Sequence, residues 1–284
     1  MPHVGIVTDS TCDLAPDVLS ALDVRMVPLK VLIGEESWLD WIELAPEQFY
    51  ERLVSSPILP KTSQPSPAEF SAVYKELADA GCDSIVSIHL TSALSGTVSS
   101  ATIAAQSAPV PVHVIDTKKV TQALALVVKA AAQARDEGAD GDRVAQVAAQ
   151  VSESMRLFFV LDTLDYLVKG GRAGKASGLA ASLLNIKPVL TMNGDGIIEP
   201  FKKVKGRKKA LAELANHVAE ESRSRGRLRV SLFHACTDDC GLELKTLIEN
   251  SGADAEIESV GFVGSVVGTY AGPNALGCAF YPLG

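Results

Sequence analysis

The sequence has few of the features of disulfide-rich, zinc-binding or membrane-spanning proteins. Its five cysteines show no framework spacing, and the nearest pair, Cys236 and Cys240, encloses three residues instead of the two of common zinc and redox motifs. No apolar run approaches the roughly 18 residues that a transmembrane helix needs. We therefore expect free thiols and no stable membrane insertion, and we leave transient membrane contact open. The N-terminal residues lack the charged and apolar regions of a signal peptide, so we expect a cytoplasmic location.

The sequence also has no excess of positively charged residues. Lys and Arg number 26 against 34 Asp and Glu, which gives a formal net charge of -8. Because an acidic surface repels phosphate, we expect no nucleic-acid partner. The five histidines are scattered and form no H-x3-H pair, so we predict no metal site.

The common catalytic and cofactor-binding motifs are absent as well. The stretch nearest to a phosphate-binding loop, Gly170–Ser177, reads GGRAGKAS. Lys169 stands where that motif requires glycine, and Ala176 replaces its hydroxyl residue. Neither a G-x-S-x-G nucleophile turn nor a dinucleotide-binding G-x-G-x-x-G after the first strand is found. We predict no catalytic residue and no cofactor.

What the sequence does contain is the alternation of an α/β protein. Strand-like runs at Val4–Asp9, Asp83–Leu90 and Val110–Asp116 are separated by amphipathic helical segments, a pattern typical of parallel strands joined by crossovers. A second set of strands and helices begins near Leu157, with a hairpin around residues 193–196. The length of 284 residues suits two α/β domains, which we place at residues 1–156 and 157–284, with a mostly parallel sheet in the first.

Hydroxyl-rich loops follow these strands. The stretch Pro60–Pro67 reads PKTSQPSP, and the segment after the second strand reads LTSALSGTVSSA from Leu90 to Ala101. Ser66 and Glu69 form a capping-box pattern before a helix. Near the helix start at Val98, Ser and Thr side chains either complete an anion cradle or simply cap the helix. The residues alone leave both interpretations open.

Taken together, the motifs become specific. Their order and spacing resemble those of the DegV family from Val4 to Phe280. The motifs that carry the resemblance are VTDSTCDL, PKTSQPSP, LTSALSGTVSSA, VIDTKKV, LDTLDYLVKGGRAG, KPVL followed by GDG, and GTYAGPNALGCAFY.

The resemblance implies a bacterial fatty-acid-binding protein. A member of this family holds one long-chain fatty acid, such as palmitate, between two α/β domains and presents its carboxylate to a separate fatty acid kinase subunit. The acyl phosphate can then enter phospholipid synthesis, and the binding protein itself does not catalyse the transfer. The residues that match the family's carboxylate-binding motifs are Thr62 and Ser95.

The resemblance also suggests further site residues. Arg172 matches the family's GGR and is expected near the ligand head, whereas Tyr270 and Asn274 depart from the common GTHTGPG pattern. The residues themselves predict two apolar helices around the glycine break at Gly170 and Gly171, and their apolar side chains either line a pocket for the acyl chain or simply pack in the core. The basic stretch KKVKGRKK, with Lys205 and Arg207, is either a docking surface for the kinase or a solvated helix start. The expected pocket residues are Leu164, Leu167, Leu179, Ala180, Leu183, Leu184, Phe262 and Phe280.

An alternative from another functional class is a small-molecule hydrolase. It would use the loop after the first strand, where Asp9, Ser10 and Asp13 follow one another closely. The same residues suit a turn in which Asp and Ser cap the next helix, and we favour that interpretation.

Overall fold

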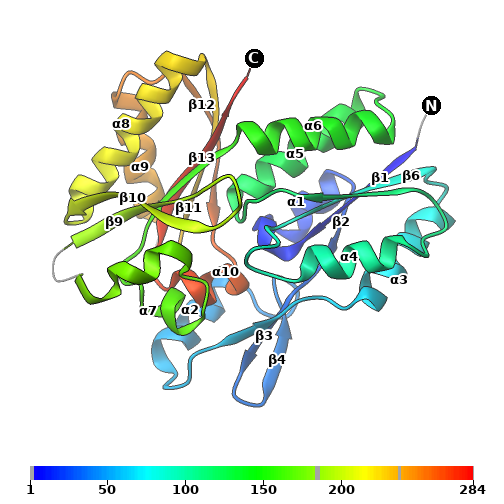
Figure 1. Cartoon of the computed structure of the whole chain (residues 1–284), viewed down its shortest axis with the longest axis horizontal. Helices are drawn as coiled ribbons and strands as arrows, with labels where there is room; N and C mark the ends of the chain where they lie inside the picture. The colour runs from blue at the N-terminus through cyan, green and yellow to red at the C-terminus, as the bar shows by residue number, and fades with distance from the viewer. Residues whose placement is uncertain (1–2, 183–185, 236–237, 284) are drawn as a thin grey trace.

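The computed structural model describes residues 3–182, 186–235 and 238–283 (Figure 1). In this part of the chain the strands form a four-stranded sheet, a six-stranded sheet and a small three-stranded sheet. The strands are β1 (Val4–Asp9), β2 (Val24–Val27), β3 (Lys30–Ile33), β4 (Glu36–Leu39), β5 (Lys61–Ser63), β6 (Ser84–His89), β7 (Val112–Asp116), β8 (Arg156–Val160), β9 (Ile186–Met192), β10 (Ile198–Lys205), β11 (Leu228–His234), β12 (Ala255–Phe262) and β13 (Leu276–Pro282).

The helices connect and cover these sheets. The α-helices are α1 (Pro16–Ala21), α2 (Pro46–Ser55), α3 (Pro67–Asp79), α4 (Thr97–Ala105), α5 (Gln122–Asp136), α6 (Gly141–Ser154), α7 (Asp165–Lys169), α8 (Arg207–Arg225), α9 (Asp238–Asn250) and α10 (Ser265–Ala271). Two 3-10 helices, η1 (Ser10–Cys12) and η2 (Gly174–Ser182), complete the set for the described residues.

The four-stranded sheet is parallel throughout, in the order β2-β1-β6-β7. Helices α3 and α4 pack on one face, and α5 and α6 pack on the other. Side chains of a strand alternate between faces, so Val7 joins the core under α3 and α4 while Ile6 joins the core under α5. The predicted α/β fold with a parallel first sheet is confirmed, and the predicted capping box of Ser66 and Glu69 begins α3.

The six-stranded sheet is mixed, in the order β10-β9-β8-β13-β11-β12. Its outer face is covered by α8 and α9, and its inner face meets α5, which also contacts β1 and β6 of the parallel sheet. Figure 1 shows α5 and α6 between the two sheets. The main core therefore runs from one sheet to the other, and the chain passes between them at Met155. A domain boundary between residues 156 and 157 stays a prediction.

The small sheet was not predicted from the sequence. Strands β4, β3 and β5 pair antiparallel, and Thr62 of the expected loop pairs with Val31. These strands have only three or four residues, too few to show alternation. Residues 61–63 are thus held as an edge strand, which positions Thr62 more firmly than a loop would.

The segment after α7 also differs from the prediction. We expected two apolar helices around a glycine break, but α7 has only five residues and the second element is the 3-10 helix η2. Gly171 and Gly174 have positive φ values of 72° and 50°, which interrupt a regular α-helix. Across the described residues, the structure has no helix long and apolar enough to cross a membrane.

Candidate ligand-binding site

A largely apolar cavity lies between the parallel sheet, the mixed sheet and α10. It encloses about 770 Å³ of space between atoms, counting the part open to solvent at its mouth. Both halves of the chain contribute to the wall. The lining residues are Thr11, Leu29, Leu90, Leu94, Ser95, Val120, Thr121, Leu157, Phe159, Leu161, Leu167, Arg172, Met192, Ile198, Phe233, Val263, Val266, Val267, Tyr270, Ala271 and Ala275.

Several polar side chains lie close together at one part of this wall, and we call them the polar group. Tyr270 Oη and Thr62 Oγ1 are 2.6 Å apart and share a hydrogen bond, which joins α10 to the edge strand β5. The guanidinium of Arg172 lies over the Tyr270 ring, 4.8 Å from its centroid. Arg172 Nη1 donates to the carbonyl of Gly170 at 2.7 Å, and Nε donates to the carbonyl of Leu94 at 3.3 Å. These contacts, made through Nη1 and Nε, hold the guanidinium beside the cavity.

Ser95 reaches the cavity from the loop before α4. Its Oγ lies 2.9 Å from Thr97 Oγ1 and accepts a long hydrogen bond of 3.4 Å from the Thr97 amide, so it also caps the start of α4. Gly96 allows the side chain of Gln64 to pack closely, because a Cβ at Gly96 would lie 2.3 Å from Gln64 Oε1. Gln64 Nε2 then donates to Ser100 Oγ at 3.2 Å. The two hydroxyl-rich segments predicted to form one site are thus packed against each other.

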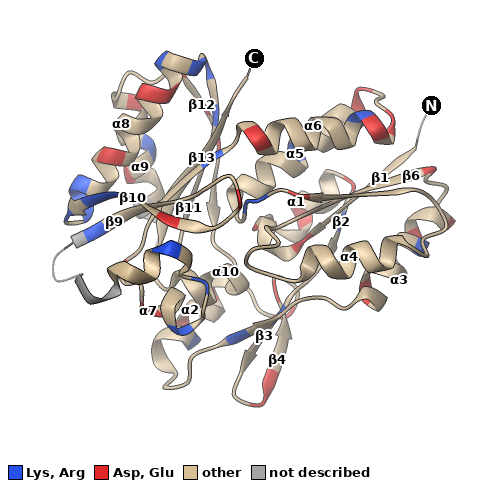
Figure 2. Ribbon diagram, viewed as in Figure 1, with Lys and Arg blue, Asp and Glu red and all other residues tan. Residues whose placement is uncertain are grey.

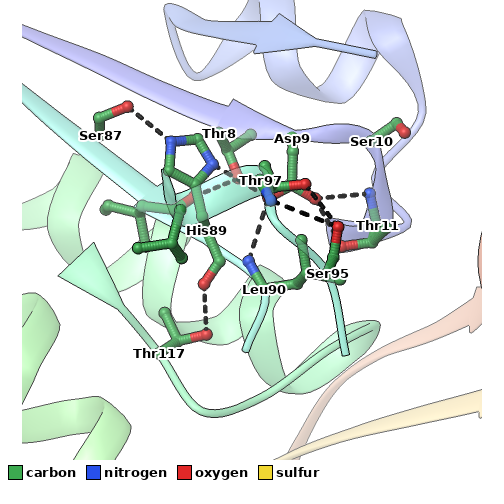
Figure 3. Close-up of polar contacts among 12 residues, drawn as sticks. Thr8, Asp9, Ser10, Thr11, Ser87, His89, Leu90, Ser95, Thr97 and Thr117 are labelled. Atoms are coloured by element: carbon green, nitrogen blue, oxygen red, sulfur yellow. Dashed lines mark hydrogen bonds and ion pairs between the residues drawn. The ribbon is translucent and has the colours of Figure 1, made fainter. Parts of the chain in front are cut away.

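The buried carboxylate of Asp9, at the end of β1, holds Thr11 and the end of β6, from which the loop to Ser95 leads (Figure 3). Asp9 Oδ1 accepts from the amide and hydroxyl of Thr11 at 3.0 and 2.5 Å. Asp9 Oδ2 accepts from the Leu90 amide and from His89 Nδ1, both at 3.0 Å. The ends of β1 and β6 are therefore joined where the cavity wall begins.

His89 extends this network away from the cavity. Ser87 Oγ lies 2.6 Å from His89 Nε2, and Tyr74 Oη lies 2.8 Å from Ser87 Oγ. In the neutral imidazole whose Nδ1 donates to Asp9, Nε2 accepts from Ser87, which in turn accepts from Tyr74. Burial raises the pKa of Tyr74 to about 12, against a smaller lowering by Ser87, so its hydroxyl stays protonated and donates.

The order Ser87, His89, Asp9 has the connectivity of a Ser-His-Asp triad, but its surroundings are those of a core. All three side chains are fully buried, and the Phe70 ring packs edge-on against His89 at 5.0 Å. None of the three lines the cavity. The network therefore serves to orient Asp9, and Figure 3 shows Ser87 on the far side of His89 from Ser95.

The other residues of the hydrolase alternative are also engaged in the fold. Ser10 Oγ accepts from the Leu29 amide at 3.1 Å, and Trp41 Nε1 donates to Asp13 Oδ1 at 3.5 Å. Burial raises the pKa of Asp13 well above its usual value, and the nearby Asp40 charge adds to the rise. Within the described residues, no three His, Cys, Asp or Glu lie close enough together to hold a metal ion.

The predicted acyl-chain residues fall into different places. Leu167 lines the cavity, Leu164 is buried in the same core, and Leu179 and Phe262 pack partly buried against it. Phe280 lies on the outer face of the mixed sheet, beneath α8, because it alternates with Ala279 and Tyr281 of the inner face. The side chain of Ala180 and the whole of Leu183 and Leu184 lie outside the described residues.

Several wall residues were missed by sequence reasoning. Leu157 and Phe159 of β8, Met192 of β9 and Phe233 of β11 all line the cavity. Their alternation with outward-facing neighbours is a visible signal, since Phe158 and Val160 belong to the opposite core. Which of the two faces meets a cavity cannot be read from that alternation.

The expected docking residues lie near the start of α8. Lys205 is exposed at the end of β10, whereas Arg207 Nη1 donates to the carbonyl of Asn274 at 2.8 Å and lies 3.8 Å from Asp162 Oδ1. Asn274 has a φ of 60° and donates to Asp162 Oδ2 at 2.8 Å. Asparagine tolerates this left-handed conformation better than most residues, so its replacement of glycine here keeps the turn.

The substitution Asp40→Asn tests the buried carboxylate that accepts a hydrogen bond from the first residue of α10. The Ser265 amide donates to Asp40 Oδ1 at 3.0 Å, and burial raises the pKa of Asp40 to about 7, against hydrogen bonds led by Ser10 that lower it. Since the unfolded pKa is about 3.9, the folded protein binds more protons between these values. The free energy of unfolding contributed by Asp40 therefore falls as pH rises from about 4 to about 7.

Asparagine keeps the acceptor and removes the charge. We expect the variant to gain stability relative to the unmodified protein as pH rises through this window, measured by urea unfolding at about pH 5 and about pH 8. Asp195→Asn, in an exposed turn, is the matched control and should show no such trend. A stability difference that stays constant with pH would show that Asp40 ionises normally.

Comparisons with known proteins agree with this architecture. The family model described as "Uncharacterised protein, DegV family" matches residues 3–283. A DegV domain-containing protein of Deinococcus radiodurans is 39% identical over 99% of both chains. A fatty-acid-binding DegV family protein from Thermus thermophilus superposes with a TM-score of 0.93 at 33% identity, covering 99% of this chain and 100% of its own. DegV of Bacillus subtilis, a fatty acid binding protein, gives a TM-score of 0.90 at 29% identity over 99% of both chains. The chain thus belongs to the DegV family.

Proposed function

We propose that the protein binds one long-chain fatty acid, with the acyl chain in the cavity and the carboxylate at the polar group of Thr62, Ser95, Arg172 and Tyr270. The observation that carries this proposal is the composition of the wall, which is apolar over most of its extent and includes Ser95, Arg172 and Tyr270. Fatty acid binding by structurally similar DegV proteins supports it.

The hydrogen bond between Thr62 and Tyr270 leaves donors for the ligand. Of the two hydroxyls, one donates to the other, so one hydroxyl proton of the pair is free to point at a carboxylate oxygen. Ser95 supplies another hydroxyl. Arg172 adds positive charge, while its Nη1 and Nε are engaged by backbone carbonyls. The carboxylate is thus recognised without a full bidentate clamp, which would hold it more firmly against reaction.

Most of the affinity is expected to come from the acyl chain. A sixteen-carbon acid has about fourteen methylenes, each worth roughly 0.8 kcal/mol on burial, so about 11 kcal/mol is available before costs. Association and ordering of the chain remove several kcal/mol. Hydrogen bonds to the charged head contribute about 1–3 kcal/mol each. The cavity accordingly supplies affinity, and the polar group supplies orientation.

The residues proposed to hold the carboxylate are only partly buried, which suggests delivery to a partner. We infer that the protein presents the carboxylate to a separate fatty acid kinase, which phosphorylates it to an acyl phosphate for phospholipid synthesis in the bacterial cytoplasm, and that the protein has no catalysis of its own. Basic residues gather on β10 and at the start of α8 (Figure 2). Lys205 and Arg207 of this region are the proposed docking residues. Palmitate is a representative ligand.

The head-group variants are Thr62→Ala, Ser95→Ala and Tyr270→Phe. Each should weaken binding of palmitate by about 1–3 kcal/mol, measured by calorimetry on delipidated protein, because each removes a hydroxyl of the polar group. Ser63→Ala is the matched control, since Ser63 is exposed beside Thr62 and its hydroxyl bonds only to the Gln64 carbonyl among the described residues. Unchanged affinity in all three variants would place the carboxylate elsewhere.

A series of acids of increasing length separates the contribution of the chain from that of the head. Each added methylene should tighten binding about fourfold, corresponding to about 0.8 kcal/mol, until the chain fills the cavity. Thr62→Ala should shift the whole series by a constant factor, because the head contacts do not depend on chain length. An affinity independent of chain length would rule out acyl-chain burial in the cavity.

Charge reversal tests the docking surface. Lys205→Glu should reduce acyl-phosphate formation with the kinase, and make it less sensitive to salt, without changing fatty acid affinity. Lys245→Glu, on α9, is the control for the overall change in charge. Arg207→Glu is a less clean variant because it also breaks the contacts with Asn274 and Asp162. Equal turnover by the Lys205 variant would remove this residue from the docking surface.

A further inference from the structure

A second concave site lies on the other side of the segment that carries Val120 and Thr121 into the fatty acid cavity. It is an open groove between the end of β7, the C-terminal turn of α6, the start of β8 and the hairpin of β9 and β10. Its lining residues are Ile115, Asp116, Thr117, Lys118, Lys119, Ala149, Ser152, Glu153, Met155, Arg156, Phe158, Thr191, Met192, Asn193, Gly194 and Phe201. It shares only Met192 with the wall of the cavity.

The unusual member of this groove is Lys119, a lysine that is only 5% exposed. A buried ammonium ordinarily has a carboxylate or several hydrogen-bond acceptors around it. Within the described residues, Lys119 Nζ has no hydrogen bond or ion pair, yet it is not among the atoms sealed from solvent. The small exposed part of Lys119 therefore includes its ammonium, which faces the groove.

The neighbouring carboxylate of Asp116 does not fully offset the charge of Lys119, because it already accepts hydrogen bonds from other donors. Asp116 Oδ1 accepts from the amides of Ser92 and Lys118, at 3.2 and 3.0 Å. Asp116 Oδ2 accepts from Ser92 Oγ at 2.5 Å and from Lys118 Nζ at 2.7 Å. Burial acts to raise the pKa of Asp116, but the hydrogen bonds from Lys118 and Ser92 together lower it below its usual value. Because Asp116 already pairs with Lys118, its negative charge offsets the charge of Lys119 only in part.

The remaining charges leave the groove with an excess of cations. Arg156 faces it from β8 and Glu153 from α6, so three cations, Lys118, Lys119 and Arg156, meet the two carboxylates of Asp116 and Glu153. Burial, together with the charges of Arg156 and Lys118, lowers the pKa of Lys119 to about 8, against the opposing effect of Asp116. Lys119 is still mostly protonated at neutral pH. Its charge is costly where it stands, and an anion in the groove would relieve that cost.

The other wall of the groove offers an apolar surface. Phe201 of β10 is 43% exposed and packs edge-on against Phe158, with ring centroids 4.8 Å apart. His217 supports the same ring from α8, at 4.8 Å. An exposed aromatic ring held in a fixed orientation can contact the organic part of a ligand whose anionic end reaches the cations.

We propose that this groove binds a small phosphate monoester, with the phosphate at Lys119, Lys118 and Arg156 and the organic group against Phe201. Phosphate carries close to two negative charges at neutral pH and several acceptor oxygens, which suits three cations better than a single carboxylate does. The site is separate from the proposed fatty acid cavity and does not depend on it.

Calorimetric titration with inorganic phosphate, glycerol phosphate and adenosine monophosphate tests the site in low-salt buffer. We expect saturable binding of the phosphate group, with the monoesters tighter than inorganic phosphate, and a loss of about tenfold or more in Lys119→Met. Methionine keeps a long apolar stem and removes the charge. Lys75→Met, an exposed lysine paired with Asp79 on α3, is the control and should bind as the unmodified protein does. Equal binding by Lys119→Met, or no binding of any of the three compounds, would overturn the proposal.

A second measurement does not depend on a variant folding. In protein with 13C-dimethylated lysines, the lysine signal that titrates lowest, distinguished from the dimethylated N-terminal amine by its chemical shift, should shift its pKa upward when phosphate is added, because the anion favours the protonated ammonium. Asp116, Lys118, Glu153 and Arg156 are the charged groups facing Lys119, and they are unchanged in this comparison. Fatty acid affinity should be the same with and without phosphate. A lysine pKa that phosphate does not move would contradict the assignment, whatever the outcome for the fatty acid.

Discussion

The hydrogen bonds that Asp9 accepts hold together the part of the molecule on which the ligand site depends. Its two carboxylate oxygens receive donors from the turn after β1 and from the end of β6. A buried carboxylate is stable only if it is satisfied in this way, so the two strand ends cannot separate without a large cost. Thr11 and the loop that leads to Ser95 are thereby fixed in relation to each other. His89, Ser87 and Tyr74 complete the arrangement from the core side, which explains a triad-like geometry with no access for a substrate.

The site is assembled from segments that are far apart in the chain. Thr62 and Tyr270 are 208 positions apart and share one hydrogen bond, while Arg172 reaches from the segment after α7 to the carbonyl of Leu94. Each contact joins an element of the first half to an element of the second. The apolar cavity lies beneath these contacts, so polar groups that would otherwise be costly to bury are paired at its edge. The proposed division between an acyl chain that supplies affinity and a head group that supplies orientation follows from this arrangement.

Two buried charged residues, Asp40 and Lys119, have roles apart from direct contact with the proposed fatty acid. Asp40 accepts a hydrogen bond from the first amide of α10, the helix that carries Tyr270. Its elevated pKa shows that burial opposes its charge. Lys119 lies on the opposite side of the segment that contributes Val120 and Thr121 to the cavity, and its ammonium faces the groove. Neither residue stood out in the sequence, because a single Asp or Lys carries no signal of its burial. Their roles depend on what the tertiary structure places around them.

The sequence by itself determined the α/β class, the parallel first sheet, the capping box at Ser66 and the family, because these depend on local periodicity and on motifs in order. It also indicated Thr62 and Ser95 through the resemblance, although the edge strand around Thr62 was hidden in a stretch too short to show alternation. The cavity wall was decided only by the tertiary structure. Leu157 and Phe158 are equally apolar neighbours, yet one lines the cavity and the other packs beneath α8. Alternation assigns such residues to opposite faces, but only the packing of the second sheet against α5 and α10 determines which face encloses a ligand.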